Sequence, residues 1–255
     1  MPAIDVTIVA ARRPALLAKT LESFHQRLFR HFEVSRALIN IDPIWGTEAE
    51  MNECAGLFKS IFPAAIAYTP QAPSYCRAVK RLWTNTVSDF VFHLEDDWLL
   101  LEDVSQSILE RFDDPKTAQV SLMAKEKRWD RNRRGDYHYI KRRGKIFGLF
   151  PAPIRKRVPA FTVSPGFTRG DFARTWASLM DESFDPEKQA HSGVNTKLEQ
   201  FVHPYRNYLY SGKQHYNIAV DIGREWRDAQ NIQKITANGS STWIAADRNS
   251  STLSN

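Results

Sequence analysis

The sequence predicts an α/β protein with a central, mostly parallel sheet, and three observations support this prediction. Short, apolar, β-branched segments alternate with longer amphipathic segments three times before residue 95. This alternation is typical of βαβ units, whose crossovers are right-handed. The length of 255 residues and the hydrophobic content of 42% are sufficient for one domain with a sizeable core. The two cysteines have no metal-type spacing, so neither a disulfide framework nor a zinc site is expected.

The first part of the chain contains the regular alternation. Thr47, with Glu50 three residues later, has the pattern of a helix capping box, and Ser74 is placed to cap the third helix. Pro43 ends the second strand. The expected order is strand 4–10, helix 14–28, strand 36–43, helix 47–62, strand 64–70, helix 74–86 and strand 89–94.

The second half is less regular, and a polar segment rich in Ser, Thr and Asn follows it from residue 238. We expect that segment to be loosely ordered. The expected elements are helix 101–114, strands 117–124, 145–150 and 160–167, helices 169–182 and 196–209, and a short strand passing into a helix over 217–234. The sequence thus predicts one domain over 1–237, with halves 1–101 and 102–237, and a tail over 238–255.

Targeting signals are not evident. Asp5 interrupts the first apolar stretch, which rules out a typical signal peptide, and every apolar run is far shorter than the ~20 residues of a membrane helix. We therefore expect a cytoplasmic protein without a transmembrane segment, in which Cys54 and Cys76 are free thiols.

Three adjacent carboxylates follow the fourth predicted strand in the stretch SDFVFHLEDDW, residues 88–98. Like charges this close raise the free energy of ionising one another, so a positive partner is expected beside Glu95, Asp96 and Asp97. Ligands of parallel α/β sheets bind beyond the carboxyl ends of the strands, where this triplet lies. Clustered carboxylates bind hard divalent cations, and the sequence therefore predicts a Mn²⁺ or Mg²⁺ site. The alternative is a solvated acidic turn.

Residues 4–101 resemble the nucleotide-sugar-binding half of GT-A glycosyltransferases of the family-2-like group. The resemblance lies in the order of a first strand (VTIVAARRP), a helix (LLAKTLESF), a second strand ending in Asp (INIDP), a basic helix (YCRAVKRLWTNT) and a strand ending in HLEDDW. EDD corresponds to a variant of the D-x-D motif. The resemblance implies a GT-A, Rossmann-like fold, a nucleotide-sugar donor bound by 1–101, and an acceptor half over 102–237.

The resemblance also implies roles for individual residues. Asp97 would bind the metal directly, Glu95 would face the donor ribose or sugar, and Asp96 would assist. Four residues after the first two strands would hold the base and ribose, and two cations of the third helix would approach the diphosphate or the sugar. These are Ala10, Ala11, Arg12 and Asp42, and Arg77 or Lys80. The alternatives are a turn role for Asp42 and a solvated helix face for Arg77.

An inverting enzyme needs a carboxylate that deprotonates the acceptor hydroxyl. In the family this base lies at a helix of the second half, and the candidates are Glu199 first, and then Asp181, Glu182 and Asp185. His203 or His215 would complete the metal site, although a structural or surface role is equally consistent with the sequence. Arg224 and Arg227 would pair with the diphosphate, unless Arg224 pairs with Asp228 along the helix.

The stretch SPGFTRGDFART would contribute to the acceptor side of such a site. It contains Arg169 and Asp171 at the start of a predicted helix. The alternative is a simple helix start with Thr168 as the cap and Asp171 in the first turn.

The positive charge of the chain is concentrated in one segment. Residues 125–158 contain 13 Lys and Arg against three acidic residues, a net charge of +10 in a chain of net charge +6. Aromatic residues lie between these cations, as in surfaces that bind nucleic acid. This pattern favours a hydroxyl of a modified, flipped-out DNA base as the acceptor. The alternatives are a basic loop that closes over the diphosphate, and a surface for an anionic glycan or lipid.

Two rival functions remain open. A nucleotidyltransferase of the same fold would need a glycine-rich loop after the first strand, and AARRPAL has no glycine. A non-catalytic nucleic-acid-binding protein would use 125–158 on an inert scaffold, and its function would not depend on Asp97. The sequence favours the metal-dependent glycosyltransferase, and it leaves the sugar, the nucleotide, the stereochemical course and the number of subunits open.

Overall fold

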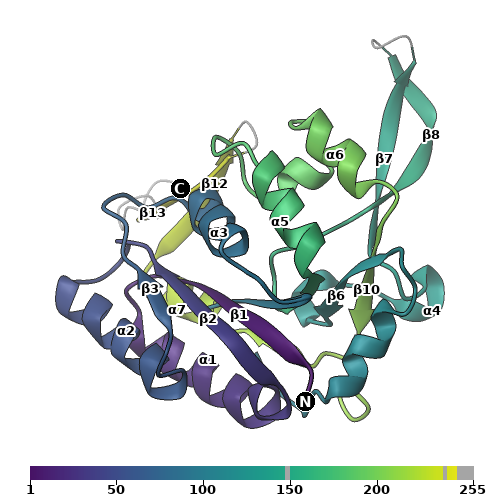
Figure 1. Ribbon diagram of the computed structural model, residues 1–255. Coiled ribbons are helices and arrows are strands. Elements are labelled where there is room, and N and C mark those ends of the chain that lie inside the picture. The colour runs from purple at the N-terminus through teal and green to yellow at the C-terminus, as the bar shows by residue number, and fades with distance from the viewer. Residues whose placement is uncertain (147–149, 238–239, 246–255) are drawn as a thin grey trace, which may run out of the picture.

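A seven-stranded sheet forms the centre of the computed structural model, which describes residues 1–146, 150–237 and 240–245 (Figure 1). The strand order is β10-β6-β9-β4-β1-β2-β3. Every neighbouring pair is parallel except those that involve β9, which runs antiparallel to both β4 and β6. The prediction of a mostly parallel sheet flanked by helices is therefore confirmed.

The helices and strands alternate regularly up to β4 and less regularly afterwards. The strands are β1 Ala3–Ala10, β2 Glu33–Ile41, β3 Ile66–Tyr68, β4 Phe90–Glu95, β5 Trp98–Leu100, β6 Thr117–Leu122, β7 Tyr139–Ile146, β8 Phe150–Pro159, β9 Gly166–Arg169, β10 Arg206–Tyr210, β11 Ala219–Asp221, β12 Ile232–Ala237 and β13 Ser240–Ala245. The α-helices are α1 Pro14–Arg27, α2 Glu48–Ile61, α3 Tyr75–Thr84, α4 Arg131–Arg134, α5 Gly170–Leu179, α6 Thr196–Val202 and α7 Gly223–Ala229.

Two hydrophobic cores lie on the two faces of the sheet. The first is formed with α1 and α2, which include the buried side chains of Phe24 and Phe58. The second is formed with α3, α5 and α6, where the rings of Trp83 and Trp176 meet edge to face at 5.3 Å. Strand β1 contributes alternate residues to both cores because successive side chains of a strand point to opposite faces.

The predicted helix caps of the first half are confirmed. The Thr47 side chain accepts a hydrogen bond from the Glu50 backbone, and the Glu50 carboxylate accepts one from the Thr47 backbone, which completes the capping box. The Ser74 side chain caps α3 by accepting from Arg77 N. Local sequence therefore fixes the starts of α2 and α3.

The predicted helix over 101–114 is wrong. Only a 3₁₀-helix over Gln106–Phe112 forms there. The backbone N–H groups of Leu101 and Val104 donate to the carbonyls of Ile218 and Arg27, which ties the start of this segment to distant parts of the chain outside any helix.

Two further predictions in the second half are corrected. The helix predicted over 196–209 ends at Val202, because Pro204 cannot continue it, and the chain continues as strand β10. The strand predicted over 160–167 begins only at Gly166, because side chains rather than a neighbouring strand bond the backbone N–H groups of Thr162 and Val163.

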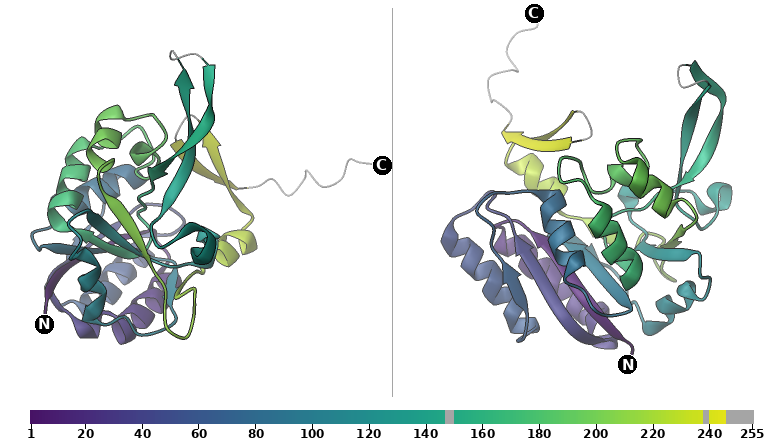
Figure 2. Two further views of the ribbon diagram at one scale, coloured as in Figure 1. Left: turned by 90° about the vertical axis from the view of Figure 1, so that its right-hand side faces the viewer. Right: turned by 45° about the horizontal axis from the view of Figure 1, so that its top comes forward.

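Hairpins occupy two of the predicted regions. The strand predicted over 145–150 covers the end of β7 and the start of β8, and 147–149 lie outside the described residues. Part of the predicted polar tail, 240–245, is not loose but pairs with β12 as strand β13, whereas 238–239 and 246–255 lie outside the described residues. Figure 2 shows the β7–β8 hairpin projecting from the body of the molecule.

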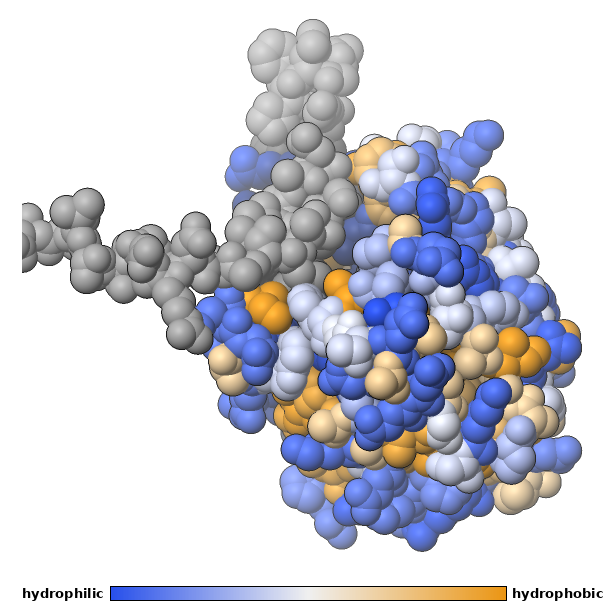
Figure 3. Space-filling model, turned by 90° about the vertical axis from the view of Figure 1, so that its left-hand side faces the viewer, coloured by the Kyte–Doolittle hydropathy of each residue, from blue (hydrophilic) through white to orange (hydrophobic). Residues whose placement is uncertain are grey.

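On the face shown in Figure 3, polar residues predominate and hydrophobic residues lie between them. Within the described part of the chain, no helix has the length and apolar character needed to span a membrane.

His93 of β4 is a buried histidine that the core keeps neutral. Its Nδ1 lies 3.1 Å from Trp83 Nε1 and 2.9 Å from Thr7 Oγ1. An indole N–H only donates, so Nδ1 accepts and the ring proton is on Nε2, which has no hydrogen-bond partner among the described residues. Burial lowers the pKa of His93 to about 3.

This burial predicts a specific loss of stability in acid. The folded-state pKa of about 3 lies below the unfolded value of roughly 6.5, so the stabilisation is complete above pH 6.5 and decreases as the pH falls. At pH 5 the decrease due to His93 should be about 2 kcal/mol. Urea unfolding at pH 7 and pH 5 should show a smaller pH dependence in His93→Gln than in the wild type. The exposed control His25→Gln should behave like the wild type, and equal pH dependence in all three proteins would contradict the assignment.

Candidate functional site

The order of the strands reverses between β1 and β4, and the acidic triplet lies at this point. β1 continues through β2 to β3 on one side, whereas β4 leads to β9 and β6 on the other. Val9 is in register with Glu95, so the carboxyl ends of both strands open at the same edge of the sheet. Loops that diverge from such a switch point leave a crevice, which is the usual ligand site of an open α/β sheet.

Helix α1 holds the turn that carries the triplet. Thr20 Oγ1 donates to the Asp96 carbonyl at 2.9 Å and accepts from Trp98 N at 3.1 Å. The Asp96 backbone N–H also donates to the Val9 carbonyl at 3.1 Å. The backbone of the turn is thus fixed on both sides, which determines where its carboxylates lie.

Asp96 binds the loop between β1 and α1. Its Oδ2 accepts from Ala11 N at 2.9 Å and from Arg13 Nε at 3.2 Å, and its Oδ1 accepts from Arg13 Nη2. Arg13 is only 8% exposed, so this bidentate pair is almost completely removed from water. Asp96 is therefore committed to holding Arg13 in place.

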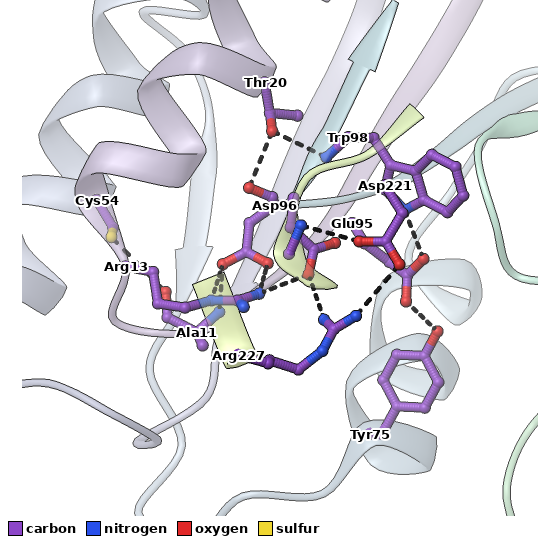
Figure 4. Close-up of polar contacts among 12 residues, drawn as sticks. Ala11, Arg13, Thr20, Cys54, Tyr75, Glu95, Asp96, Trp98, Asp221 and Arg227 are labelled. Atoms are coloured by element: carbon purple, nitrogen blue, oxygen red, sulfur yellow. Dashed lines mark hydrogen bonds and ion pairs between the residues drawn. The ribbon is translucent and has the colours of Figure 1, made fainter. Parts of the chain in front are cut away.

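Asp97 lies between two arginines that are distant in sequence. Its Oδ2 is 3.1 Å from Arg13 Nη2 and 3.1 Å from Arg227 Nη1, and Arg227 Nη2 reaches Asp221 Oδ2 at 3.2 Å (Figure 4). Arg227 thus bridges the carboxylates of Asp97 and Asp221. The positive partners that the triplet requires are these two guanidinium groups.

Glu95 occupies a different environment from its two neighbours. Its carboxylate accepts one hydrogen bond from Tyr75 OH and one from Trp98 Nε1, both at 2.9 Å. Burial, and then the charge of Asp97, raise the pKa of Glu95. Burial also raises the pKa of Asp97, and Arg13 and Arg227 oppose this shift.

Two tryptophans enclose Arg13. Its guanidinium carbon lies 5.4 Å from the centre of the Trp45 ring and 5.1 Å from that of Trp226, and the two rings lie 5.4 Å apart. Trp45 has a φ of 55°, and a Cβ on the following Gly46 would lie 2.4 Å from the Arg12 carbonyl oxygen, so only glycine fits there without a shift. This turn brings Trp45 over Arg13, where cation–π contact adds to the ion pairs.

These residues line a cavity of about 480 Å³. Its wall is formed by the ends of β1 and β4, the loop after β2, the start of α3, residues 182–185 and Arg227. The volume is in the range of sites that enclose small molecules. The cavity combines carboxylates, cations and aromatic rings, which suits a polar ligand that carries negative charge and a ring system.

The structure places the predicted nucleotide-binding residues unequally. Ala10, Ala11 and Asp42 line the cavity, whereas Arg12 does not and donates instead to the Gly46 carbonyl at 3.2 Å. Asp42 is buried and accepts from Asn40 Nδ2 at 2.8 Å, and burial raises its pKa.

The predicted cations of α3 are directed at a carboxylate. Arg77 lies 2.7 Å from Glu182, and Lys80 lies 3.6 Å from the same side chain. Glu182 and Asp185 line the cavity, and Asp181 does not. Asp185 forms no ion pair within the described structure, and its Oδ1 accepts from the backbone of Glu187.

Glu199 is not among the residues that line the cavity. It pairs with Arg142 of β7 at 2.9 Å and also accepts a hydrogen bond from Gly193 N. His203 and His215 are exposed and do not line the cavity either. The structure therefore does not bring these three predicted residues together with Asp97.

Asp171 lies in the first turn of α5, as the simple helix start predicts, but the predicted cap at Thr168 is wrong. Thr168 is inside β9, and the helix begins after Arg169 without a side-chain cap. Arg169 donates to the carbonyls of Thr117 and Phe112, and Asp171 accepts from Phe172 N. Both side chains thus serve local structure.

Arg224 and Arg227 also behave differently from each other. Arg227 enters the site, whereas Arg224 is exposed and uses its backbone N–H to bond Asp221. An Arg224–Asp228 ion pair does not form in the described part of the chain.

Sequence reasoning missed five residues of the site. These are Arg13, Trp45, Tyr75, Asp221 and Trp226. Two signals were available: Arg13 directly follows the first strand beside Arg12, and Asp221 ends a short strand as the triplet does. Trp45 and Trp226 carry no such signal, because their contact depends on tertiary structure.

No three His, Cys, Asp or Glu side chains within the described residues are grouped as a ready metal site. The carboxylates of Asp96 and Asp97 are instead paired with Arg13 and Arg227.

Comparison with known proteins identifies the fold. No protein-family model matches the sequence, and no curated protein matches it. Among solved structures, the chain is similar to the mannosyltransferase PcManGT from Pyrobaculum calidifontis, which was solved in complex with GDP-Man and Mn²⁺, with a TM-score of 0.55 and 10% identity. The match covers 89% of this chain and 61% of that one.

TarS of S. aureus is also similar, with a TM-score of 0.50 and 10% identity, over 91% of this chain and 38% of that one. This chain thus matches less than two thirds of the length of either neighbour. The likeness shows a GT-A-like glycosyltransferase fold, as the sequence resemblance implied.

The buried Arg13 cluster predicts a large loss of stability on substitution. Arg13→Leu should reduce the free energy of unfolding by about 3–5 kcal/mol, because it leaves the carboxylates of Asp96 and Asp97 buried without this partner. The matched control is Arg30→Leu, whose pair with Asp103 is about half exposed (52% and 53%) and should contribute less than about 1 kcal/mol. Urea unfolding at pH 7 measures both, and equal effects of the two substitutions would contradict the structural role of Arg13.

Proposed function

We propose that this protein is a glycosyltransferase that moves a sugar from a nucleotide-diphosphate-sugar donor to an acceptor hydroxyl. The observation that carries the proposal is the cavity at the strand-order reversal, with the Glu95-Asp96-Asp97 triplet and the cations Arg13 and Arg227 at one end. The GT-A-like fold and a structural neighbour solved with GDP-Man and Mn²⁺ support it.

The residues of the cavity match the parts of such a donor. Arg13 lines the cavity, and its Nη1 is buried without a hydrogen-bond partner among the described residues, so it can donate to a diphosphate oxygen. Asp42 and Trp45 also line the cavity, and they offer a carboxylate for ribose hydroxyls and a ring for the base.

We include Mn²⁺ or Mg²⁺ in the proposal, because the site offers carboxylate oxygens, which are ligands that suit such an ion. Asp97 and Asp221 offer carboxylate oxygens, and the charge that now bridges them is the guanidinium of Arg227. Asp97 would hold the ion, with Asp221 beside it. When bound, the ion stabilises the negative charge of the departing diphosphate.

The acceptor hydroxyl must lose its proton to a carboxylate if the enzyme inverts the anomeric centre. Of the predicted bases, Glu182 and Asp185 line the cavity, and Glu199 is paired with Arg142. Because Glu182 is held by Arg77 and Lys80, we assign the base role to Asp185 in this proposal, in place of Glu199.

For the acceptor, the proposal keeps a hydroxymethylated base in DNA, supported by the net charge of +10 over 125–158. A glycan acceptor with the same donor chemistry is the second candidate. The fold that this chain shares with its two structural neighbours does not specify the acceptor.

Donor binding can be tested by thermal unfolding against a panel of nucleotide sugars with and without Mn²⁺. A donor at 100 times its Kd stabilises the folded state by about 2.7 kcal/mol, which raises the Tm by several degrees. We expect the rise in the wild type only with metal, and none in Asp97→Asn.

The control Asp103→Asn removes an exposed carboxylate from an ion pair outside the cavity and should keep the full rise in Tm. An equal rise without metal, or in Asp97→Asn, would overturn the donor site as assigned. If no nucleotide raises the Tm of a wild type that still binds DNA at low salt, the non-catalytic binding protein becomes the better description.

A further inference from the structure

The β7–β8 hairpin is a two-stranded ribbon that stands apart from the seven-stranded sheet. Figures 1 and 2 show it projecting beyond α6, with its root beside β10. Two strands alone are marginally stable in water. Tyr139 anchors the root of the hairpin in a small hydrophobic cluster, and the charged residues of the stem need an explanation other than core packing.

Cations of the hairpin stem face one another across the two strands. Lys141 is in register with Arg157, Arg142 with Lys156, and Arg143 with Arg155. Each pair places two positive charges directly opposite each other. Side chains of directly opposed residues lie on the same face, so the first and third pairs share one face and the second pair lies on the other.

Like charges in cross-strand pairs destabilise a hairpin. Opposite charges in these cross-strand positions would stabilise the ribbon. The three pairs, all positive, thus cost folding free energy that a polyanion would recover.

Few of these cations have an anionic partner among the described residues. Arg142 donates to Glu199 and to the His191 carbonyl, which fixes the stem against α6. Five others are exposed, and none of them forms an ion pair in the described structure: Lys141, Arg143, Arg155, Lys156 and Arg157.

Aromatic contacts hold the root of the hairpin. The Arg134 guanidinium lies 3.8 Å from the ring centre of Trp129, and Arg157 lies 4.4 Å from that of Tyr139. Trp129 and Tyr139 are themselves buried with Met123. The root is therefore fixed on the body, and the stem is presented to solvent at a defined place.

We propose that the β7–β8 stem binds in the major groove of duplex DNA. The stem would thereby hold the acceptor of the proposed sugar transfer, so this inference rests on the proposed function. A two-stranded ribbon, with strands about 4.8 Å apart, fits a groove about 12 Å wide. Cations on both faces suit a groove, which has phosphates on both sides, whereas a flat anionic membrane would contact one face only. The narrow major groove of duplex RNA does not admit such a ribbon.

The test measures binding of a short fluorescent DNA duplex without donor or metal, over a range of salt concentrations. Lys141→Ser with Lys156→Ser removes one charge from each face. We expect about tenfold weaker binding and a slope of log Kd against log salt that falls by about 2. The matched control, Lys19→Ser with Lys59→Ser, removes two exposed lysines from α1 and α2 and should bind as the wild type does.

A second variant separates binding from folding. Lys141→Glu with Arg143→Glu places acids opposite Arg157 and Arg155, which should maintain or raise the Tm while weakening duplex binding further. Unchanged duplex binding in this variant, equal loss in the lysine control, or equal affinity for duplex RNA would overturn the proposal. Binding to phosphatidylglycerol vesicles with none to duplex DNA would also overturn it and would favour a membrane surface.

The two proposals fail in different ways. The hairpin variants should keep the metal-dependent rise of Tm with the donor, because no stem residue lines the cavity. If the wild type binds duplex DNA through the stem but binds no nucleotide sugar, the hairpin assignment stands and the glycosyltransferase proposal is wrong. If the donor raises the Tm normally but no duplex binds, the glycosyltransferase proposal stands and the hairpin assignment is wrong.

Discussion

The rest of the site depends on the neutralisation of buried carboxylates by two arginines. Asp96 and Asp97 directly follow a strand in the middle of the sheet, and both are buried, so their charges have little water to stabilise them. Arg13 comes from the loop next to β1, and Arg227 comes from a helix near the end of the described chain. Their pairing brings the first and last parts of the fold to one point. The shape of the cavity, the position of the β1–α1 loop and the enclosure of Arg13 by two tryptophans all follow from it.

Much of the first half could be predicted from sequence because its determinants are local. The capping box at Thr47, the cap at Ser74 and the apolar periodicity each specify an element within a few residues. In the second half, distant partners decide the structure. Leu101 and Val104 bond to carbonyls far along the chain, and Thr162 and Val163 bond to side chains, so local propensity gave the wrong element.

The site was predictable in position but not in its connections. The triplet at the end of a central strand indicated where the ligand binds, and the need for a positive partner followed from charge alone. Charge alone did not identify the arginines that supply this partner. Arg13 and Arg227 are distinguished from Arg12 and Arg224 only by where the backbone directs them. Glu199 illustrates the converse: its helical context suggested chemistry, yet its partner is Arg142 of the hairpin.

The separation of Asp97 and Arg227 by 130 residues has a consequence for biosynthesis. A ribosome releases the β1–β4 region long before α7, and N-terminal regions begin to fold as they emerge. During that interval Arg13 is the only guanidinium among the described residues that can pair with Asp97, because Arg227 has not yet been synthesised. The crevice is thus assembled in two stages, because Arg227 is synthesised only after the hairpin and the residues of the second hydrophobic core.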